Sequence, residues 1–320
     1  MADRLGAPLP TPIFEELAII GVGLIGSSIA RAARRRHAAR RIVLADHSVG
    51  VLERAKALGL GDVVTDDVAR AVGAADCVIL CAPVGANEAI GRLIAPALKP
   101  GVIVSDVGSV KGAVVTTLEP ILPKHARLVP AHPVAGTEYS GPDAGFATLF
   151  MNRWCILTPP ERTDAEAANK MRAFWEALGA HVETMSPTHH DLVLAITSHV
   201  PHLIAYNLVG AAADLEEVTQ SEVMKFSAGG FRDATRIAAS DPTMWRDVFL
   251  NNRDAVLEML GRFNEDLTAL QRMIRRGDGE GLHALFTRTR AIRMGIVALG
   301  QDTAAPDFGR HAGETDELTS

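Results

Sequence analysis

The chain is poor in cysteine and in excess charge, and each shortage excludes a class of protein. It has three cysteines among 320 residues, Cys77, Cys81 and Cys155, and their spacing is not that of a metal site. Cys77 and Cys81 fall on an apolar strand pattern, which favours buried, reduced thiols. The net charge of −6 comes with no basic patch of the kind that binds nucleic acid. We therefore expect no bound metal and no nucleic-acid partner.

Long hydrophobic runs are also missing. No apolar run reaches the roughly eighteen residues that a membrane-spanning helix needs, and the first residues, Met-Ala-Asp-Arg, lack the apolar centre of a signal peptide. These absences predict a protein without a membrane partner, located in the reducing cytoplasm. The length of 320 residues is enough for two ordinary domains.

The most informative segment that is present lies near the N-terminus. The apolar run Leu17 to Ile20 has the pattern of a buried strand, and Gly21, Gly23 and Gly26 follow it at GxGxxG spacing. In a dinucleotide-binding turn the first glycine permits a tight turn and the second lets the backbone approach a pyrophosphate. The third lets the helix pack closely on the strand. The sequence therefore predicts a dinucleotide site here.

The residues after the glycines complete this site. A helix that begins with Leu24 and Ile25 would offer its free N–H groups to the phosphates. Asp46 follows a second apolar run, Ile42 to Ala45, and its carboxylate would accept hydrogen bonds from the ribose hydroxyls. Because a 2′-phosphate would meet a like charge at Asp46, we expect NAD rather than NADP, although FAD proteins use a similar fold. Pro83, after a later strand, is also assigned to the cofactor.

Strand and helix patterns alternate over residues 13–185. Besides the two strands already described, strands are predicted at 63–64, 77–81, 102–105, 127–129 and 154–157. Helices are predicted at 86–98, 111–118 and 164–178. This alternation is typical of an α/β domain with a parallel, doubly wound sheet of the Rossmann type. Residues 179–185 are predicted to form its final edge strand.

The pattern becomes purely helical after residue 185. Ser186 and Pro187 offer an N-cap and a proline at the first helical position, and helical periodicity continues with breaks at 229–230 and 241–242. Long helices are predicted at 254–276 and 281–299. We expect residues 186–302 to form an all-α domain that shares its core with a second copy, as a homodimer. Residues 1–12 and 303–320 are predicted to be disordered tails.

Two turns after predicted strands carry candidate catalytic residues. Ser109 lies in the turn 105–111, where ligands of a parallel sheet bind. Its hydroxyl is suited to donate to a substrate oxygen, or alternatively to cap the helix that Lys111 opens. His132 lies before a proline, on restricted, extended backbone. Its imidazole can take a proton from a hydroxyl while hydride leaves the same carbon, but a loop histidine bonded to backbone is the simpler interpretation.

The helical region adds two histidines and a cation. His199 and His202 stand three residues apart on one helical face, and zinc is disfavoured because no third ligand has metal-type spacing. Arg236, in the stretch 229–236, could hold a carboxylate with its planar guanidinium. Ion pairing at a helix end is the alternative for this arginine.

These stretches together resemble the prephenate/arogenate dehydrogenase family of tyrosine biosynthesis. The motifs occur in the family's order over residues 15–300: GVGLIG, SDVGSVKG, HPVAGTEYSG, TSHVPH, and GGFRDATR followed by SDPTMW. The resemblance implies a Rossmann domain that binds NAD or NADP, a helical dimerisation domain and an active site between them. It also implies the oxidative decarboxylation of a cyclohexadienol, either prephenate to 4-hydroxyphenylpyruvate or arogenate to tyrosine.

The resemblance assigns a role to each candidate residue. His132 becomes the catalytic histidine bonded to the ring hydroxyl, Ser109 helps to orient it, and Arg236 binds a substrate carboxylate. The residues that line or gate the substrate pocket would be His199, His202, Thr137, Glu138 and Asp233.

Two other functions compete with this one. A β-hydroxyacid-dehydrogenase-like NAD(P) oxidoreductase has a similar architecture but uses a helix lysine, for which the helical region offers Lys225 without a matching asparagine. A non-catalytic NAD-responsive protein would not need His132 and Arg236 together.

Overall fold

The computed structural model describes residues 11–137, 139–219 and 225–298, which fall into two compact units that divide between Met259 and Leu260. Most of the two predicted tails, and Glu138, lie outside the described residues.

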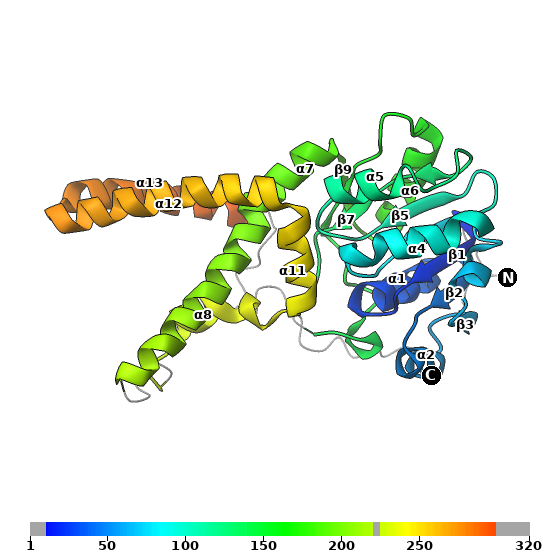
Figure 1. The fold of residues 1–320 in the computed structure, drawn as a ribbon, viewed down its shortest axis with the longest axis horizontal. Helices are drawn as coiled ribbons and strands as arrows, with labels where there is room; N and C mark the ends of the chain where they lie inside the picture. Colours follow the sequence, from blue (N-terminus) through cyan, green and yellow to red (C-terminus); the bar gives the residue numbers. More distant parts are fainter. Residues whose placement is uncertain (1–10, 138, 220–224, 299–320) are drawn as a thin grey trace. The chain divides into compact units, whose positions relative to one another are not determined.

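A six-stranded parallel sheet forms the centre of the first unit (Figure 1). Its strands lie in the order β3 (Val63–Thr65), β2 (Ala39–Ala45), β1 (Phe14–Ile20), β4 (Cys77–Leu80), β5 (Ile103–Asp106) and β6 (Arg127–Leu128). The parallel, doubly wound sheet predicted from the sequence is therefore confirmed. The strand order reverses between β1 and β4, and in such sheets ligands bind outside the carboxyl ends of the strands at this point.

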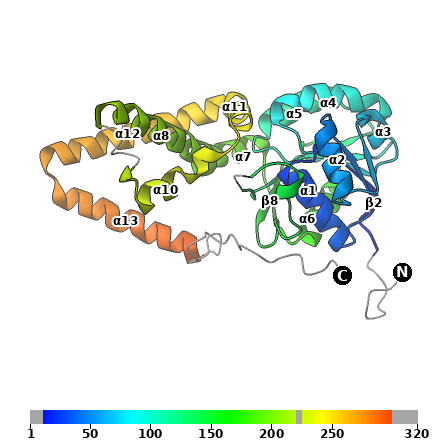
Figure 2. The same cartoon turned by 90° about the horizontal axis from the view of Figure 1, so that it is seen from below.

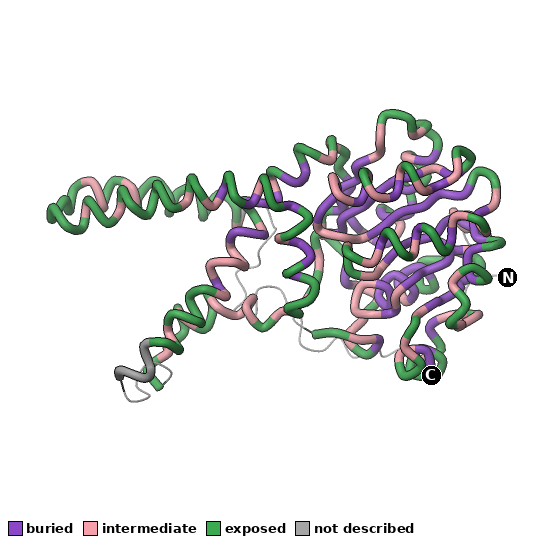
Figure 3. The backbone as a smooth tube through the Cα atoms, in the orientation of Figure 1, coloured by how far each residue is buried: buried purple, intermediate pink, exposed green. Residues whose placement is uncertain are grey.

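Alternate side chains of the strands serve two separate hydrophobic cores. Leu17 and Ile19 of β1 join the core covered by α1 (Leu24–Arg35), α2 (Val49–Ala57) and α6 (Ala165–Ala177). Ala18 and Ile20 join the core covered by α3 (Val68–Val72), α4 (Asn87–Ile94) and α5 (Gly112–Leu118). Figure 2 shows α3, α4 and α5 gathered along one side of the strands, and in Figure 3 the strands are the most continuously buried part of the chain. Both faces of the sheet are thus covered, as parallel strands require.

A second, three-stranded sheet follows the first one in the sequence. It contains β7 (Ala131–Pro133), β8 (Trp154–Leu157) and β9 (His181–Thr184), with β7 antiparallel and β9 parallel to β8. The prediction that 154–157 and 179–185 extend the doubly wound sheet is therefore wrong. The apolar pattern of a segment predicts that it is a strand but does not specify its partner. Here Pro130 lies two residues after the end of β6, and because proline has no N–H group it cannot continue the hydrogen-bond ladder.

Two shorter features also differ from the predicted elements. The helix predicted at 86–98 is divided into a 3₁₀ turn, η1 (Val84–Ala86), the helix α4 and a second 3₁₀ turn, η2 (Ala95–Ala97). Pro96 lies in η2, where its missing N–H group ends the α-helical ladder. His132, expected in a loop after a strand, instead lies within β7.

Helices make up the remainder of the first unit. They are α7 (Pro187–Leu194), a π-helical turn (Ala195–His199), α8 (Val200–Thr219), α10 (Gly229–Thr235), the 3₁₀ turn η5 (Arg236–Ala239) and α11 (Pro242–Asn251). The predicted start of α7 is confirmed, since the Ser186 hydroxyl accepts a hydrogen bond from the N–H of His189. Asp241 caps α11 in the same way through the N–H of Met244, at 2.8 Å.

Residues 187–214 of this helical region are long and apolar enough to cross a membrane, judged by length and composition alone, but core helices of soluble proteins pass the same test. It contains the polar residues His190, Asp191, His199 and His202, which are atypical of a membrane span. The absence of a membrane partner stays a prediction.

The boundary between the units falls inside α12 (Arg253–Arg276), so the second unit contains this helix from Leu260 onward. It also contains α13 (Gly279–Ala298). Gly277 joins the two helices with a backbone φ of +67°, a value that glycine adopts readily. Large apolar side chains in this unit are exposed, among them Ile274, Phe286, Ile292 and Met294. A helix pair with so many apolar side chains in water has the surface of an interface.

Candidate active site

The glycine-rich turn is shaped as the sequence predicts. Gly21 has a φ of +95°, and a Cβ there would lie 2.8 Å from the carbonyl carbon of Cys81. A Cβ on Gly26 would lie 2.0 Å from the carbonyl oxygen of Gly21, whereas a Cβ on Gly23 would meet no atom within 4 Å. The turn and the helix therefore require glycine at positions 21 and 26, and the backbone at Gly23 is open to a ligand.

The start of α1 is suited to an anion. Its N-cap, Gly23, makes no side-chain cap, and its first turn holds no acidic residue. The N–H groups of Leu24 and Ile25 therefore face no competing carboxylate from the first turn, and the helix dipole adds a partial positive charge. Pro83 lies just beyond β4, the neighbouring strand, at the start of η1. The residues that follow the carboxyl ends of β1 and β4 thus fit a dinucleotide, which is consistent with the predicted roles of Gly21, Gly23, Gly26 and Pro83.

Asp46 holds the glycine-rich turn in place. One carboxylate oxygen accepts a hydrogen bond from the N–H of Val22, and the other accepts one from the N–H of Ser48, each at 2.9 Å. A carboxylate has about four lone-pair positions, so both oxygens retain capacity for ribose hydroxyls. Its negative charge would repel a 2′-phosphate on a ribose bound to these oxygens.

The candidate catalytic histidine, His132, is the first of three side chains that are joined by hydrogen bonds. Nδ1 of His132 lies 2.8 Å from Nε2 of His190, and Nδ1 of His190 lies 2.8 Å from a carboxylate oxygen of Asp191. All three residues are buried. His132, on β7, is therefore oriented by two residues of α7, which the sequence analysis identified only as part of a helix start.

Asp191 also binds the turn that contains Ser109. Its carboxylate accepts hydrogen bonds from the N–H groups of Lys111 and Gly112, both at 2.8 Å, and so caps α5. The alternative in which Ser109 caps this helix is wrong, because Asp191 occupies that position. Ser109 is half-buried, and among the described contacts no hydrogen bond joins it to His132.

A buried ion pair lies behind β7. Nζ of Lys111 lies 2.5 Å from a carboxylate oxygen of Asp106 and 2.7 Å from the carbonyl oxygen of Ala131, which it contacts as a donor. Both charged side chains are inaccessible to solvent. Burial lowers the pKa of Lys111 and raises that of Asp106, while the attraction between the two charges opposes both shifts.

The environment keeps His132 neutral. Burial lowers the pKa of His132 well below its usual value of 6.5, and His190, Lys111 and His199 lower it further. A neutral imidazole can accept a proton, whereas an imidazolium cannot. At neutral pH His132 is therefore in the form that a general base requires.

His199 and His202 lie beside Trp245 of α11. The ring of His202 stacks on that indole with the centroids 3.6 Å apart, and the ring of His199 meets it edge-on at 6.0 Å. Burial lowers the pKa of each histidine to about 4, so both are neutral. Among the residues that the structure describes, no group of three metal-ligating side chains occurs.

The remaining predicted residues lie around this cluster. Arg236 is half-buried at the start of η5, and its charge lowers the pKa of His202, which places a cation near that ring. Asp233 is more exposed and forms an ion pair with its neighbour Arg232 at 3.3 Å. Thr137 is half-buried after β7, where its hydroxyl accepts a hydrogen bond from the N–H of Tyr139. Glu138 lies outside the described residues.

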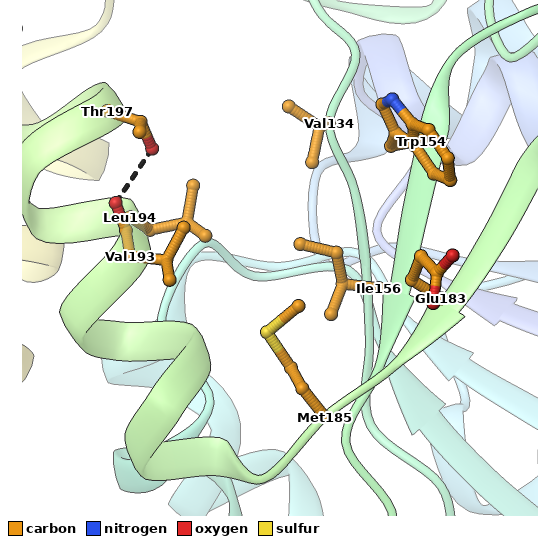
Figure 4. A pocket seen from close by; sticks show the side chains of 8 residues that line it. All are labelled: Val134, Trp154, Ile156, Glu183, Met185, Val193, Leu194 and Thr197. Atoms are coloured by element: carbon orange, nitrogen blue, oxygen red, sulfur yellow. Dashed lines mark hydrogen bonds between the residues drawn. The ribbon is translucent and has the colours of Figure 1, made fainter.

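A separate apolar hollow of about 220 Å³ lies between α7 and the second sheet (Figure 4). It is lined by Val134, Trp154, Ile156, Glu183, Met185, Val193, Leu194 and Thr197. None of the predicted site residues lines it. The chemistry predicted from the sequence therefore belongs to the polar cluster around His132 and not to this hollow.

Comparison with known families decides the classification. The nucleotide-binding domain of prephenate dehydrogenase matches residues 29–184, and the dimerisation domain of prephenate dehydrogenase matches residues 186–288. The chain belongs to the prephenate dehydrogenase family. The two matches cover most of its length and include every catalytic and substrate-binding residue predicted above.

Individual relatives agree with this classification. A cyclohexadienyl dehydrogenase of Zymomonas mobilis is 47% identical over 89% of this chain and 97% of its own length. The crystal structure of an Aquifex aeolicus prephenate dehydrogenase with hydroxyphenyl propionate and NAD⁺ is similar with a TM-score of 0.83. It is 36% identical and covers 88% of this chain and 98% of its own. A Synechocystis arogenate dehydrogenase has a TM-score of 0.74 and 28% identity over 88% of this chain and 99% of its own.

The structure adds site residues that the sequence did not identify. They are Asp106, Lys111, His190, Asp191, Trp245 and Asn252. Asp106 and Lys111 carried one usable signal, since they flank a turn directly after a buried strand. Asn252 carried none, because its side-chain hydrogen bonds are with residues more than fifty positions away in the sequence.

Proposed function

We propose that this chain catalyses the NAD-dependent oxidative decarboxylation of prephenate, of arogenate, or of both, as a step in tyrosine biosynthesis. The observation that carries the proposal is the buried, neutral His132, held by His190 in the same unit as an intact dinucleotide turn. The family membership and the cyclohexadienyl, prephenate and arogenate dehydrogenases among the relatives support it. The competing β-hydroxyacid dehydrogenase function is not supported by these relatives.

The cofactor site can be assigned to named groups. Gly21, Gly23 and Gly26 shape the turn, the N–H groups of Leu24 and Ile25 would hold the pyrophosphate, and Asp46 would accept hydrogen bonds from the ribose hydroxyls. A bound nicotinamide would supply a hydride acceptor there. The carboxylate of Asp46 favours NAD, because a 2′-phosphate would bring a second negative charge to the same place.

His132 moves the proton of the substrate. As hydride leaves the ring carbon that bears the hydroxyl, the O–H bond weakens and Nε2 of His132 accepts that proton. The bond from the opposite ring carbon to its carboxylate then breaks, CO₂ departs, and the electron pair of that bond enters the ring. The ring oxygen takes the proton back from His132, and the product is a phenol. Because the ring becomes aromatic, the protein mainly has to position the substrate.

The substrate carboxylates need a fixed cation. Arg236 lies near His202, and the ring of His202 stacks on the indole of Trp245. A guanidinium can bind a carboxylate through two parallel hydrogen bonds. We assign Arg236 to a substrate carboxylate, and Thr137 and Asp233 to the rim of the pocket.

Initial rates measured with prephenate and arogenate, each with NAD and with NADP, test the proposed reaction. We expect turnover with at least one of the two substrates and a clear preference for NAD. Failure of all four combinations would remove the proposed function. A preference for NADP would overturn the assignment of Asp46.

The variant H132N tests the catalytic assignment. Asparagine retains a polar group near Nδ1 but cannot act as a base, so we expect a loss of turnover of about 10²–10⁴-fold. The dissociation constant for NAD, measured by titration calorimetry, should not change. Turnover equal to that of the wild type would contradict the role of His132.

We also propose that the chain is a cytoplasmic homodimer whose interface includes the second unit. The exposed Ile274, Phe286, Ile292 and Met294, and the match to a dimerisation domain, support the assembly. Analytical ultracentrifugation should give the mass of two chains. The double variant I274K/F286K should shift that mass toward one chain, while a change such as L93K, on exposed α4, should not.

A further inference from the structure

Two histidines of the site are bonded by groups whose donor or acceptor character is fixed. His132 and His199 each have one ring nitrogen bonded inside the protein. A neutral imidazole has one N–H donor and one lone pair, so the bond at one nitrogen determines the state of the other. The states of both rings can therefore be derived from the surrounding hydrogen bonds.

The state of His132 follows from Asp191. A carboxylate only accepts, so Nδ1 of His190, 2.8 Å from Asp191, carries a hydrogen and donates it. Neutral His190 then presents a lone pair at Nε2, so Nδ1 of His132, 2.8 Å away, must be the donor in that bond. Nε2 of His132 is left with its lone pair, and no described side chain donates a hydrogen bond to it.

The state of His199 follows from Asn252. The amide nitrogen of Asn252 donates to the carbonyl oxygen of Asp191 at 2.9 Å, which fixes the orientation of the amide, because a carbonyl cannot donate. The same nitrogen lies 3.0 Å from Nδ1 of His199, so its second hydrogen is donated there. Nδ1 of His199 is therefore an acceptor, and its Nε2 carries the hydrogen.

The N–H of His199 is buried and available. His199 is inaccessible to solvent, and its Nε2 has no hydrogen-bond partner among the described residues. The backbone of Ser109 lies near the ring of His199, where it acts against the lowering of the pKa by burial. A buried donor without a partner costs free energy unless a ligand satisfies it.

We propose that Asp191 and Asn252 are positioning residues that fix opposite tautomers of the two histidines. His132 presents a lone pair to the substrate, and His199 presents an N–H. The pair is built for a substrate with both a hydroxyl that must lose its proton and an oxygen that must accept a hydrogen bond. This assignment rests on the proposed function only for the identity of the substrate, and the tautomers themselves do not depend on it.

Nitrogen-15 NMR of the full-length protein labelled at histidine measures the tautomers directly. Protonated and unprotonated ring nitrogens differ widely in chemical shift, and H132N and H199N identify the two signals by their loss. We expect a hydrogen on Nδ1 of His132 and on Nε2 of His199. His202 is an internal reference, because its Nδ1 donates to the carbonyl of Ser198 at 2.8 Å, independently of Asn252. The opposite tautomer at either His132 or His199 would overturn the proposal.

The variant N252D reverses one of the bonds without changing the size of the side chain. A carboxylate accepts where the amide donated, so we expect the hydrogen of His199 to move to Nδ1 and kcat/KM for the substrate to fall about ten- to a hundredfold. The matched control is N251D, since Asn251 is the next residue and its amide donates only to the carbonyl of Asp247, at 2.7 Å. We expect N251D to keep both tautomers and the wild-type kcat/KM.

Two variants of His190 test the hydrogen bond that sets the tautomer of His132. In H190Q the glutamine amide oxygen can take the place of Nε2 and accept the hydrogen bond from His132. In H190N the shorter side chain reaches only the position of Nδ1, beside Asp191. We expect H190Q to retain the Nδ1–H tautomer of His132 and most of kcat, and H190N to lose both. An equal kcat/KM in N252D and wild type, or an equal kcat in H190N and H190Q, would contradict the positioning role even if the tautomers are as expected. If no substrate is turned over, the NMR result still decides the proposal.

Discussion

Replacement of Lys111 by methionine should destabilise the protein strongly, because it leaves a carboxylate buried without its partner. The Lys111 ammonium lies 2.5 Å from Asp106, and neither side chain is accessible to solvent. Removal of one partner of a buried ion pair typically costs about 3–5 kcal/mol of unfolding free energy. Since domains are stable by about 5–15 kcal/mol, K111M should lose a large part of its stability.

The size of this loss can be separated from a general effect of removing a lysine. Lys99 forms a comparable contact with Asp76, with Nζ 2.7 Å from a carboxylate oxygen, but its side chain is 36% exposed. A partly exposed pair contributes about 0–1 kcal/mol, so K99M should change stability by no more than that. The double variant D106N/K111M has no buried charge to compensate, and we expect it to be more stable than K111M alone.

Urea unfolding followed by circular dichroism, at one protein concentration for all variants, measures these differences. The reasoning would be refuted if K111M lost no more stability than K99M. It would also be refuted if D106N/K111M were no more stable than K111M, because the cost would then come from lost packing and not from the unpaired Asp106.

Three further predictions concern the cofactor turn, the substrate and pH. G26A should weaken NAD binding at least tenfold in calorimetric titration, because its Cβ would lie 2.0 Å from a backbone oxygen that cannot move away cheaply; unchanged affinity would contradict the predicted turn. R236Q should raise the KM for the substrate about tenfold or more in steady-state kinetics while the KM for NAD stays constant, and an equal KM would rule out a carboxylate contact. Burial lowers the pKa of His199 from 6.5 to about 4, so the unfolded chain binds the proton more tightly than the folded protein does. The contribution of neutral His199 to the unfolding free energy should therefore be complete above pH 6.5. It should decline by up to about 3 kcal/mol as the pH falls toward 4. In urea unfolding, H199N should reduce this decline, and an identical pH dependence would exclude His199 as its source.

The sequence allowed the nucleotide-binding half to be predicted well because its signals are local. Gly21 and Gly26 are required by backbone contacts within the turn, and their spacing is visible in the sequence. The alternation of strands and helices likewise predicts a parallel sheet. The partner of a strand is a long-range choice, however, and so residues 154–157 were assigned to the wrong sheet.

The candidate site divides in the same way. His132 and Arg236 belong to motifs that are recognisable in sequence, so they could be named in advance. The groups that set their chemical state could not, because they act across long separations: Asp191 caps a helix 80 residues earlier, and Asn252 bonds His199 from 53 residues later. Pairings of this kind leave no periodicity or spacing in a single sequence. They become visible only when the fold brings the residues together.

The cap that Asp191 provides to α5 has a practical consequence for domain exchange between relatives. The two matched family domains meet at residues 184 and 186, and a chimera built from two enzymes would naturally be joined there. That junction would place α5 and His132 in one parent, and Asp191 and His190 in the other. Recombinants that mismatch the turn before α5 with the first turn of α7 should therefore fail in folding and in turnover together. A crossover point beyond Asp191 would keep these contacts within one parental segment.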